Sequence, residues 1–168
     1  ADHGDLLGDF GRFFKTCFFD GAVKIPFIWR VPGLFVGGEH HTRTQLVGLQ
    51  DILPTLCAVT ERPLDQDVDG TDLTPVFRDA ERRGRDHFIA QTISSPAQKY
   101  MVRTQHWKYV YSQLGGIEEL YKTDEADYEL ASLACRLEYE GVLRELREVL
   151  IGWCRENGDS DMLTDGDL

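Results

Sequence analysis

The sequence predicts an α/β fold in two parts, the edge of a larger sheet followed by a small α+β subdomain. Residues 25–31 are mostly apolar and β-rich, which is typical of a strand buried on both faces, yet no parallel partners for it follow. Three runs between residues 86 and 112 have the β-branched and aromatic content of neighbouring antiparallel strands. Residues 137–156 form an amphipathic pattern that predicts a helix covering this second sheet.

The first 24 residues predict a loop that carries candidate site residues. Glycines at positions 4, 8, 11 and 21 break any regular period, and glycine accepts positive φ without steric cost, so the backbone can fold tightly. Asp2 and His3 open the chain, and Lys15 stands between aromatic residues. An acid and an imidazole followed by a cation indicate metal ligands beside a positive charge that faces an anion.

The middle of the chain predicts a helix over residues 45–59, where leucine, isoleucine and valine recur at helical spacing. Pro54 requires this helix to begin late, near Asp51, or to be kinked, because proline lacks a backbone N–H and clashes inside a helix. A polar loop follows over residues 60–74, and a short helix is predicted over 73–77.

The second half predicts a sheet that is covered by one helix. The three antiparallel strands are predicted at 86–93, 99–104 and 106–112, with a short fourth at 119–121 and Gly115-Gly116 as the turn. Asn157-Gly158 is a typical stop for the helix at 137–156, and the last ten residues form a solvated acidic tail. The predicted division is therefore 1–80, 81–158 and 159–168.

The composition is that of a globular chain and restricts its partners. The chain has 168 residues, of which 42% are hydrophobic, and its net charge is -11. This charge opposes binding to nucleic acid or to an anionic membrane surface. No apolar run approaches the roughly 20 residues of a membrane helix. The four cysteines lack zinc-ligand spacing, which favours reduced core residues over a metal site or a disulfide framework.

A series of short motifs, each weak by itself, gains specificity from its order and spacing between residues 2 and 121. The series resembles the C-terminal portion of a type I sulfatase of the alkaline phosphatase superfamily. The motifs are Asp2-His3-Gly4, Gly8-Asp9-Phe10-Gly11, Lys15, Phe19–Pro26, Arg30–Gly33, Leu49–Leu56, Asp69–Leu73, Met101–Thr104, Trp107-Lys108-Tyr109 and Glu119-Leu120-Tyr121.

The resemblance implies a sulfuric ester hydrolase with a formylglycine nucleophile and one divalent metal, usually calcium. It implies that residues 1–80 belong to the edge of an alkaline-phosphatase-like mixed sheet and that residues 86–156 form the antiparallel subdomain of the family. Asp2 and His3 resemble two metal ligands of the family. Lys15 resembles the lysine that contacts the sulfate group and the leaving oxygen, which gives it a catalytic and a substrate-binding role.

The chemistry of sulfate esters agrees with these implied roles. A sulfate monoester needs positive charge where the transferred and leaving oxygens gain negative charge, and a metal together with a lysine supplies it. The carboxylate of Asp2 suits a hard cation such as calcium, whereas the imidazole of His3 is a better ligand for manganese or zinc. The identity of the metal therefore stays open between these ions.

The chain also departs from the family pattern. The family's nucleophile lies in a C/S-x-P-x-R motif, and neither Cys17 nor Cys57 stands in such a motif. Phe10 occupies a position where many relatives carry histidine. The chain begins without an initiator methionine, and we expect it to be part of a longer protein. Its expected partners are the missing N-terminal part of the same domain and a small-molecule sulfate ester, and alone it is not expected to be active.

Three functions remain open at the level of the sequence. The first is a fragment of a sulfatase, and the second is a phosphonate monoester or phosphodiester hydrolase of the same superfamily, for which Asp2 and His3 fit equally well. The third is a non-catalytic remnant. His40 and His41 are interpreted as surface or substrate-cleft residues, because adjacent side chains of an extended link point apart.

Overall fold

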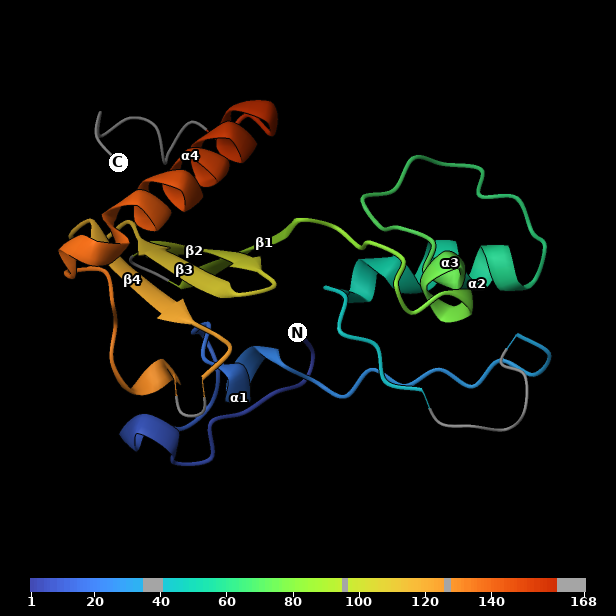
Figure 1. Cartoon of the computed structure of the whole chain (residues 1–168), viewed down its shortest axis with the longest axis horizontal. Helices are drawn as coiled ribbons and strands as arrows, with labels where there is room; N and C mark the ends of the chain where they lie inside the picture. Colours follow the sequence, from blue (N-terminus) through green and yellow to red (C-terminus); the bar gives the residue numbers. More distant parts are fainter. Residues whose placement is uncertain (35–40, 95–96, 126–127, 160–168) are drawn as a thin grey trace.

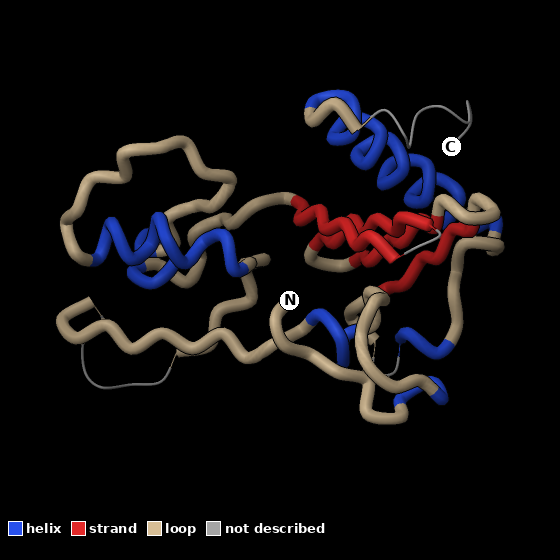
Figure 2. The backbone as a smooth tube through the Cα atoms, turned by 180° about the vertical axis from the view of Figure 1, so that it is seen from behind, coloured by secondary structure: helices blue, strands red, loops and turns tan. Residues whose placement is uncertain are grey.

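The computed structural model describes residues 1–34, 41–94, 97–125 and 128–159. Its larger part is a four-stranded antiparallel sheet with the long helix α4 (Glu140–Glu156) on one face and the N-terminal segment on the other (Figures 1 and 2). The short helices α2 (Ile52–Val59) and α3 (Thr74–Arg78) lie together at the other end of the molecule. The chain that leads into strand β1 (His87–Ser94) joins them to the sheet (Figure 1). The predicted antiparallel subdomain with its covering helix is thereby confirmed.

The sheet is a simple meander whose register places one set of apolar side chains on each face. Val102 pairs with Ile89 on one side and with Tyr109 on the other, and Tyr109 pairs in turn with Leu120. Because successive side chains of a strand point to opposite faces, this register puts these four residues on the same face. The strands, in their order across the sheet, are β1 His87–Ser94, β2 Ala97–Thr104, β3 Trp107–Ser112 and β4 Ile117–Lys122.

Helix α4 (Glu140–Glu156) covers this face and follows a short 3₁₀ helix, η5 (Leu137–Tyr139). Its leucines recur every three or four residues, so they form one apolar stripe against the sheet. Full burial of a side chain of this size contributes about 1.5–3 kcal/mol, which makes this cluster the main source of stability for the subdomain. Its buried members are Tyr100, Val102, Tyr109, Tyr111, Leu120, Leu143, Leu146, Leu150 and Cys154.

A salt bridge between Arg147 of α4 and Glu118 of β4 fixes the orientation of the helix on the sheet. Arg147 donates from Nε and Nη2 to the two carboxylate oxygens of Glu118, at 2.9 and 2.6 Å. The hydroxyl of Tyr109 donates to the same carboxylate at 2.7 Å. Burial, followed by the hydrogen bond to Glu118, raises the pKa of Tyr109, so this hydroxyl stays neutral and remains a donor.

The opposite face of the sheet is covered by the N-terminal segment (Figure 1). This segment contains the 3₁₀ helix η1 (Asp9–Gly11) and one turn of helix, α1 (Asp20–Val23), and is otherwise irregular, as the dense glycines predict. Phe18 is buried against Met101 and Val110 of the sheet. The first 24 residues are therefore not a free arm, because their second half packs on the C-terminal subdomain.

The helix predicted at 45–59 begins late, as Pro54 requires. A 3₁₀ helix, η3 (Leu49–Asp51), leads into α2 (Ile52–Val59), so Pro54 falls in the first turn of α2. The N–H groups of a first turn have no partner within the helix, so the missing N–H of proline costs no hydrogen bond there. The short helix predicted at 73–77 is α3 (Thr74–Arg78).

Asp51 joins the start of α2 to the loop that precedes α3. Its carboxylate is fully buried and accepts hydrogen bonds from the backbone N–H groups of Gly48 and Thr71, both at 2.8 Å. Arg85 Nη2 donates to it at 2.5 Å. One side chain thus binds three stretches of chain that are far apart in the sequence.

Gly70 allows the loop before α3 to approach α2 closely, and replacing it with alanine should destabilise the protein. A Cβ atom there would lie 1.9 Å from the carbonyl oxygen of Gln50, which is backbone and cannot turn away. We expect Gly70→Ala to cost about 1–3 kcal/mol, which lowers the melting temperature by roughly 2–12 °C. Gly141→Ala is the matched control, because nothing lies within 4 Å of its added Cβ. Equal melting temperatures for the two variants would contradict this prediction.

The strand predicted at 25–31 is absent, and this corrects two expectations. No strand is assigned to these residues, and within the described part of the chain the only sheet is the antiparallel one, so no edge of a mixed sheet is present. Burial on both faces is also wrong, because Ile28 is 89% exposed. A strand requires a neighbour for its backbone hydrogen bonds, and here the segment instead contacts α3 through Trp29 and Phe77, whose ring centroids are 5.5 Å apart.

The structure also tests what the sequence predicts for the cysteines, for membrane-spanning helices and for the acidic tail. Cys17 and Cys154 are buried, as predicted for core residues, whereas Cys57 is half-buried and Cys135 is exposed. No helix among the described residues is both long enough and apolar enough to cross a membrane. Of the predicted acidic tail at 159–168, only Asp159 lies within the described residues.

Candidate functional site

The segment that carries Asp2, His3 and Lys15 is a loop closed by its own backbone. The N–H of Leu6 donates to the carbonyl oxygen of Phe14 at 3.0 Å. The carboxylate of Asp5 accepts from the N–H groups of Leu7 and Phe14, at 3.1 and 3.0 Å. These bonds hold residues on either side of the loop together, so positions far apart in this stretch of sequence lie side by side.

A small apolar cluster anchors the loop. Leu6 is 2% exposed and packs with Cys17 and with Ala22 of α1. Gly4 lies directly against α1, since a Cβ at this position would be 2.4 Å from the carbonyl oxygen of Ala22. Only glycine permits this approach, which places the Asp2-His3-Gly4 stretch on α1.

The three site residues predicted from the sequence lie together in the structure. Lys15 Nζ donates to Oδ1 of Asp2 at 2.6 Å, and Nε2 of His3 lies 4.0 Å from the same oxygen. The side chains are open to solvent, with 42% of Lys15 and 63% of both Asp2 and His3 exposed. A small anion or a metal ion can therefore reach all three groups.

The electrostatics of this trio keep Asp2 ionised. The hydrogen bond from Lys15, followed by the charge of its ammonium group, lowers the pKa of the Asp2 carboxyl below its ordinary value. A carboxylate must be deprotonated to bind a metal ion, and on Oδ1 such an ion would compete with the ammonium group of Lys15.

Asp2 and His3 fit a metal only as part of a larger ligand set. A carboxylate oxygen and an imidazole nitrogen are both good donors, and the 4.0 Å between Oδ1 and Nε2 is a separation that two ligands of one cation can have. Zinc takes about four ligands and calcium about six to eight. Throughout the described stretches, no group of three or more His, Cys, Asp or Glu side chains could hold a metal ion. Further ligands are therefore needed.

A small cavity lies between the N-terminal segment and the sheet. Its volume is about 180 Å³, below the roughly 300 Å³ at which pockets for small-molecule ligands begin. Arg12 and Lys99 bring positive charge to its wall, and Glu119 brings negative charge. The cavity is too small and too mixed in charge to define a ligand by itself.

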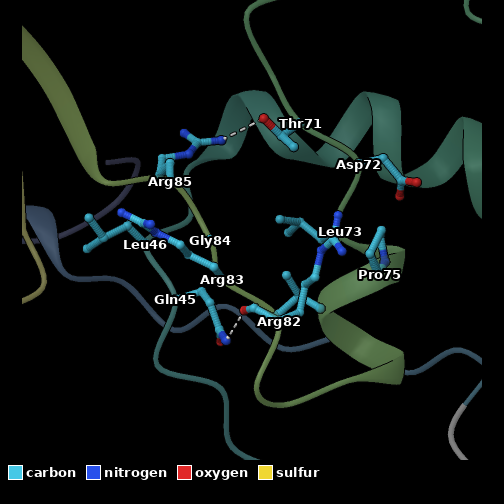
Figure 3. Close-up of a pocket in the computed structure, with 11 residues that line it drawn as sticks. Gln45, Leu46, Thr71, Asp72, Leu73, Pro75, Arg82, Arg83, Gly84 and Arg85 are labelled. Atoms are coloured by element: carbon cyan, nitrogen blue, oxygen red, sulfur yellow. Dashed lines mark hydrogen bonds between the residues drawn. The ribbon is translucent and has the colours of Figure 1, made fainter.

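A larger cavity of about 290 Å³ lies beside α3 and the chain that leads to β1 (Figure 3). Three arginines line it, but two of them are already engaged. Arg85 donates to Thr71 Oγ1 at 3.3 Å, as Figure 3 shows, in addition to its bond with Asp51, and Arg83 is paired with Asp86. None of the site residues predicted from the sequence lines this cavity, and its contacts are those that hold the loops together.

The histidine pair predicted on the surface or in a cleft is only partly described. His41 is exposed, in agreement with the surface interpretation, and His40 lies outside the described residues.

Sequence reasoning missed the role of Lys108, which it used only as part of a motif. The side chain of Lys108 is 1% exposed, although lysine side chains are ordinarily exposed to water. A signal existed in the alternation of β3, which puts Lys108 on the same face as the apolar Val110 rather than on a polar face.

A family model and known proteins match this chain over most of its length. The model described as N-sulphoglucosamine sulphohydrolase, C-terminal, matches residues 8–156. The choline-sulfatase of Rhizobium meliloti (strain 1021) is 31% identical over 134 residues, which cover 80% of this chain and 26% of that protein. An arylsulfatase of Clostridium perfringens (strain 13 / Type A) is 26% identical over 164 residues, which cover 96% of this chain and 34% of that protein.

Solved structures show the same fold. A crystal structure of a protein assigned to the sulfatases, from Bacteroides thetaiotaomicron VPI-5482, superposes with a TM-score of 0.85 and 26% identity. The superposition covers 95% of this chain and 36% of that one. The structure of BT1596, a 2-O GAG sulfatase, superposes with a TM-score of 0.59 and 26% identity over 66% of this chain. This chain thus spans between about a quarter and about a third of the length of its matches.

Proposed function

The chain belongs to the sulfatase family, of which it represents the C-terminal region, and from this premise we propose that it forms part of an enzyme that hydrolyses sulfate monoesters. The observation that carries the proposal is the meeting of Asp2, His3 and Lys15 in one exposed group, with Lys15 Nζ 2.6 Å from the Asp2 carboxylate. Exposed ion pairs contribute little to stability, so this group is not needed to hold the fold together.

Asp2 and His3 would hold a divalent metal together with ligands from outside this chain. The family resemblance favours calcium, and the imidazole of His3 leaves manganese and zinc as alternatives. A bound metal supplies positive charge to the ester oxygens without moving a proton.

Lys15 would contact the sulfate group and the leaving oxygen of the ester. Its ammonium group is held beside Asp2 by the closed loop, so a sulfate ester drawn to a metal on Asp2 and His3 would meet a second positive charge there. Such a charge stabilises the negative charge that develops in the transition state more than it stabilises the bound ester, and this difference accelerates the reaction.

The nucleophile would come from outside this chain. No C/S-x-P-x-R motif occurs in the 168 residues, so a formylglycine at that motif has to be supplied by the remaining part of the catalytic domain. Exposed leucines on α2 support such a partner, since Leu53 is 44% and Leu56 46% exposed, which is unusual for the apolar side of a helix.

The proposal is tested with the longer protein that contains this chain, assayed on matched aryl sulfate and aryl phosphate esters. We expect kcat/KM to be higher for the sulfate ester and to be lost when a chelator removes the metal, with recovery on adding calcium, manganese or zinc. A higher kcat/KM for the phosphate ester would favour the phosphonate monoester or phosphodiester hydrolase. Absence of both activities in the metal-loaded protein would contradict a catalytic function.

A further inference from the structure

We propose that Lys108, a buried residue of the C-terminal sheet, is a positioning residue for the candidate active site. It binds the stretch of chain that follows Lys15 and thereby fixes where the ammonium group of Lys15 and the Asp2-His3-Gly4 stretch lie. This inference rests on the proposed function only for the catalytic roles of Asp2, His3 and Lys15. The contacts of Lys108 stand by themselves.

All three N–H donors of the Lys108 ammonium group have an acceptor. Nζ donates to the carbonyl oxygen of Phe18 at 2.9 Å, to Oδ1 of Asp20 at 2.6 Å and to Oε1 of Glu129 at 2.5 Å. An ammonium group has three N–H donors, so these three acceptors satisfy it completely. The ammonium also lies 5.2 Å from the centre of the Tyr128 ring, within the range of a cation–π contact.

Glu129 closes the network from a third part of the chain. It belongs to the 3₁₀ helix η4 (Tyr128–Leu130), and both of its carboxylate oxygens accept the backbone N–H of Asp20 at 2.9 Å. Burial by itself would raise the pKa of Asp20, but the hydrogen bond and charge of Lys108 outweigh this effect, so the net pKa is lowered. The Asp20 carboxyl group therefore accepts from Lys108 as an anion.

The residues held by Lys108 are directly connected to the candidate site. Phe18 follows Lys15 by three residues and is buried against Met101 and Val110 of the same sheet face. Asp20 begins α1, and the carbonyl oxygen of Ala22 in α1 is the surface on which Gly4 rests. The stretch that carries Lys15 and the stretch that carries Asp2 and His3 are thus both attached to the segment that Lys108 binds.

The free-energy cost of burying charges indicates that the network of Lys108, Asp20 and Glu129 serves to position the N-terminal segment more than to stabilise the fold. Removing a pair of charges from water is costly, and well-packed apolar replacements of buried ion pairs are often neutral or stabilising. A methionine fills much of the space of a lysine stem without its charge. An apolar residue could therefore hold the sheet together, but it could not bind the Phe18 carbonyl and the Asp20 carboxylate at fixed positions.

The test compares Lys108→Met with Lys122→Met in amide hydrogen exchange of the longer protein. Lys122 is the matched control, because it lies on the adjacent strand, is 39% exposed and makes only a surface ion pair with Glu125 at 3.4 Å. We expect exchange of residues 15–23 to accelerate by about tenfold or more in Lys108→Met, with unchanged exchange in β2, β3 and α4. Unchanged exchange at residues 15–23 would overturn the inference.

A kinetic readout separates positioning from stability in the same variants. A displacement of a catalytic group by about 1 Å can cost about a hundredfold in rate, so we expect kcat of Lys108→Met to fall by roughly 10- to 100-fold with KM changed less than about threefold. The Lys122→Met variant should match the wild type. A folded Lys108→Met variant with wild-type kcat would overturn the positioning role even if its exchange is faster.

A second variant covers the case in which Lys108→Met does not fold. Glu129→Gln keeps the shape of the side chain and leaves Lys108 its bonds to Phe18 and Asp20, while it removes one charge and weakens the acceptor of the Asp20 N–H. It should show the same changes in exchange and kcat, smaller in size, and wild-type behaviour in both would overturn the inference. If the wild type hydrolyses no sulfate ester, the proposed function fails, whereas the exchange experiment still decides whether Lys108 places this segment.

Discussion

Replacing Lys15 with methionine is expected to lower kcat/KM for a sulfate ester by about 10²- to 10³-fold, the range found when one preorganised donor to a developing negative charge is removed. Methionine keeps the length of the side chain and removes its ammonium group. The loss should fall mainly on kcat, because the positive charge acts most strongly where the leaving oxygen gains negative charge. The measurement is steady-state kinetics of the longer protein with an aryl sulfate.

The design of this experiment separates catalysis from folding. Lys15 and Asp2 are both open to solvent, and exposed ion pairs contribute little to stability, so the melting temperature should hardly change. Lys24→Met is the matched control, since Lys24 lies in the same segment, is 79% exposed and has only a surface contact with Asp20 at 3.7 Å. A Lys15→Met variant that retains kcat/KM within about threefold of the control would remove Lys15 from the catalytic machinery.

Replacing Asp51 with alanine is expected to destabilise the protein by about 3–5 kcal/mol, the range for breaking a buried ion pair by removing one partner. The Asp51 carboxylate is fully buried and binds Gly48, Thr71 and Arg85. Its removal leaves two backbone N–H groups and a half-buried guanidinium without their acceptor. The loop before α3 would then lose its attachment to α2.

Urea unfolding of the longer protein measures this effect, with Asp86→Ala as the control. Asp86 also pairs with an arginine, Arg83, but its side chain is 68% exposed, so its loss should cost less than about 1 kcal/mol. Asp51→Asn should lie between the two, because an amide keeps one accepting oxygen, while its NH2 group cannot accept and the side chain has no charge for Arg85. Equal midpoints for Asp51→Ala and Asp86→Ala would show that the network around Asp51 does not stabilise the fold.

The contacts of Asp51 join two motifs whose order the sequence shows but whose proximity it does not predict. The stretches Leu49–Leu56 and Asp69–Leu73 both belong to one ordered series of motifs, but no residue pattern in either stretch indicates that the two are in contact. In the structure Thr71 donates its N–H to Asp51, and Gly70 lies against Gln50. The order of the motifs along the chain can be taken directly from the sequence. Their contact in space depends on the path of the backbone, which no local pattern predicts.

The candidate site shows the same division. Asp2, His3 and Lys15 were predicted as site residues from the resemblance of the ordered motifs to the sulfatases, and the chemistry of a sulfate ester agrees with that prediction. Their meeting, at 2.6 Å between Lys15 and Asp2, depends on the closed loop between them. Lys108 was not predicted as a support for this site, since its partners Phe18 and Asp20 lie about 90 residues earlier in the chain.

By itself, the sequence determined the elements whose signals are local. The β-branched and aromatic content of β1 to β3, the apolar stripe of α4 and the late start of α2 at Pro54 are each patterns of residues a few positions apart. Only the tertiary structure decided that residues 25–31 are not a strand and that Lys108 lies buried under the N-terminal segment. The physical reason is that a strand and a buried charge both need hydrogen-bond partners, and these partners come from distant parts of the chain.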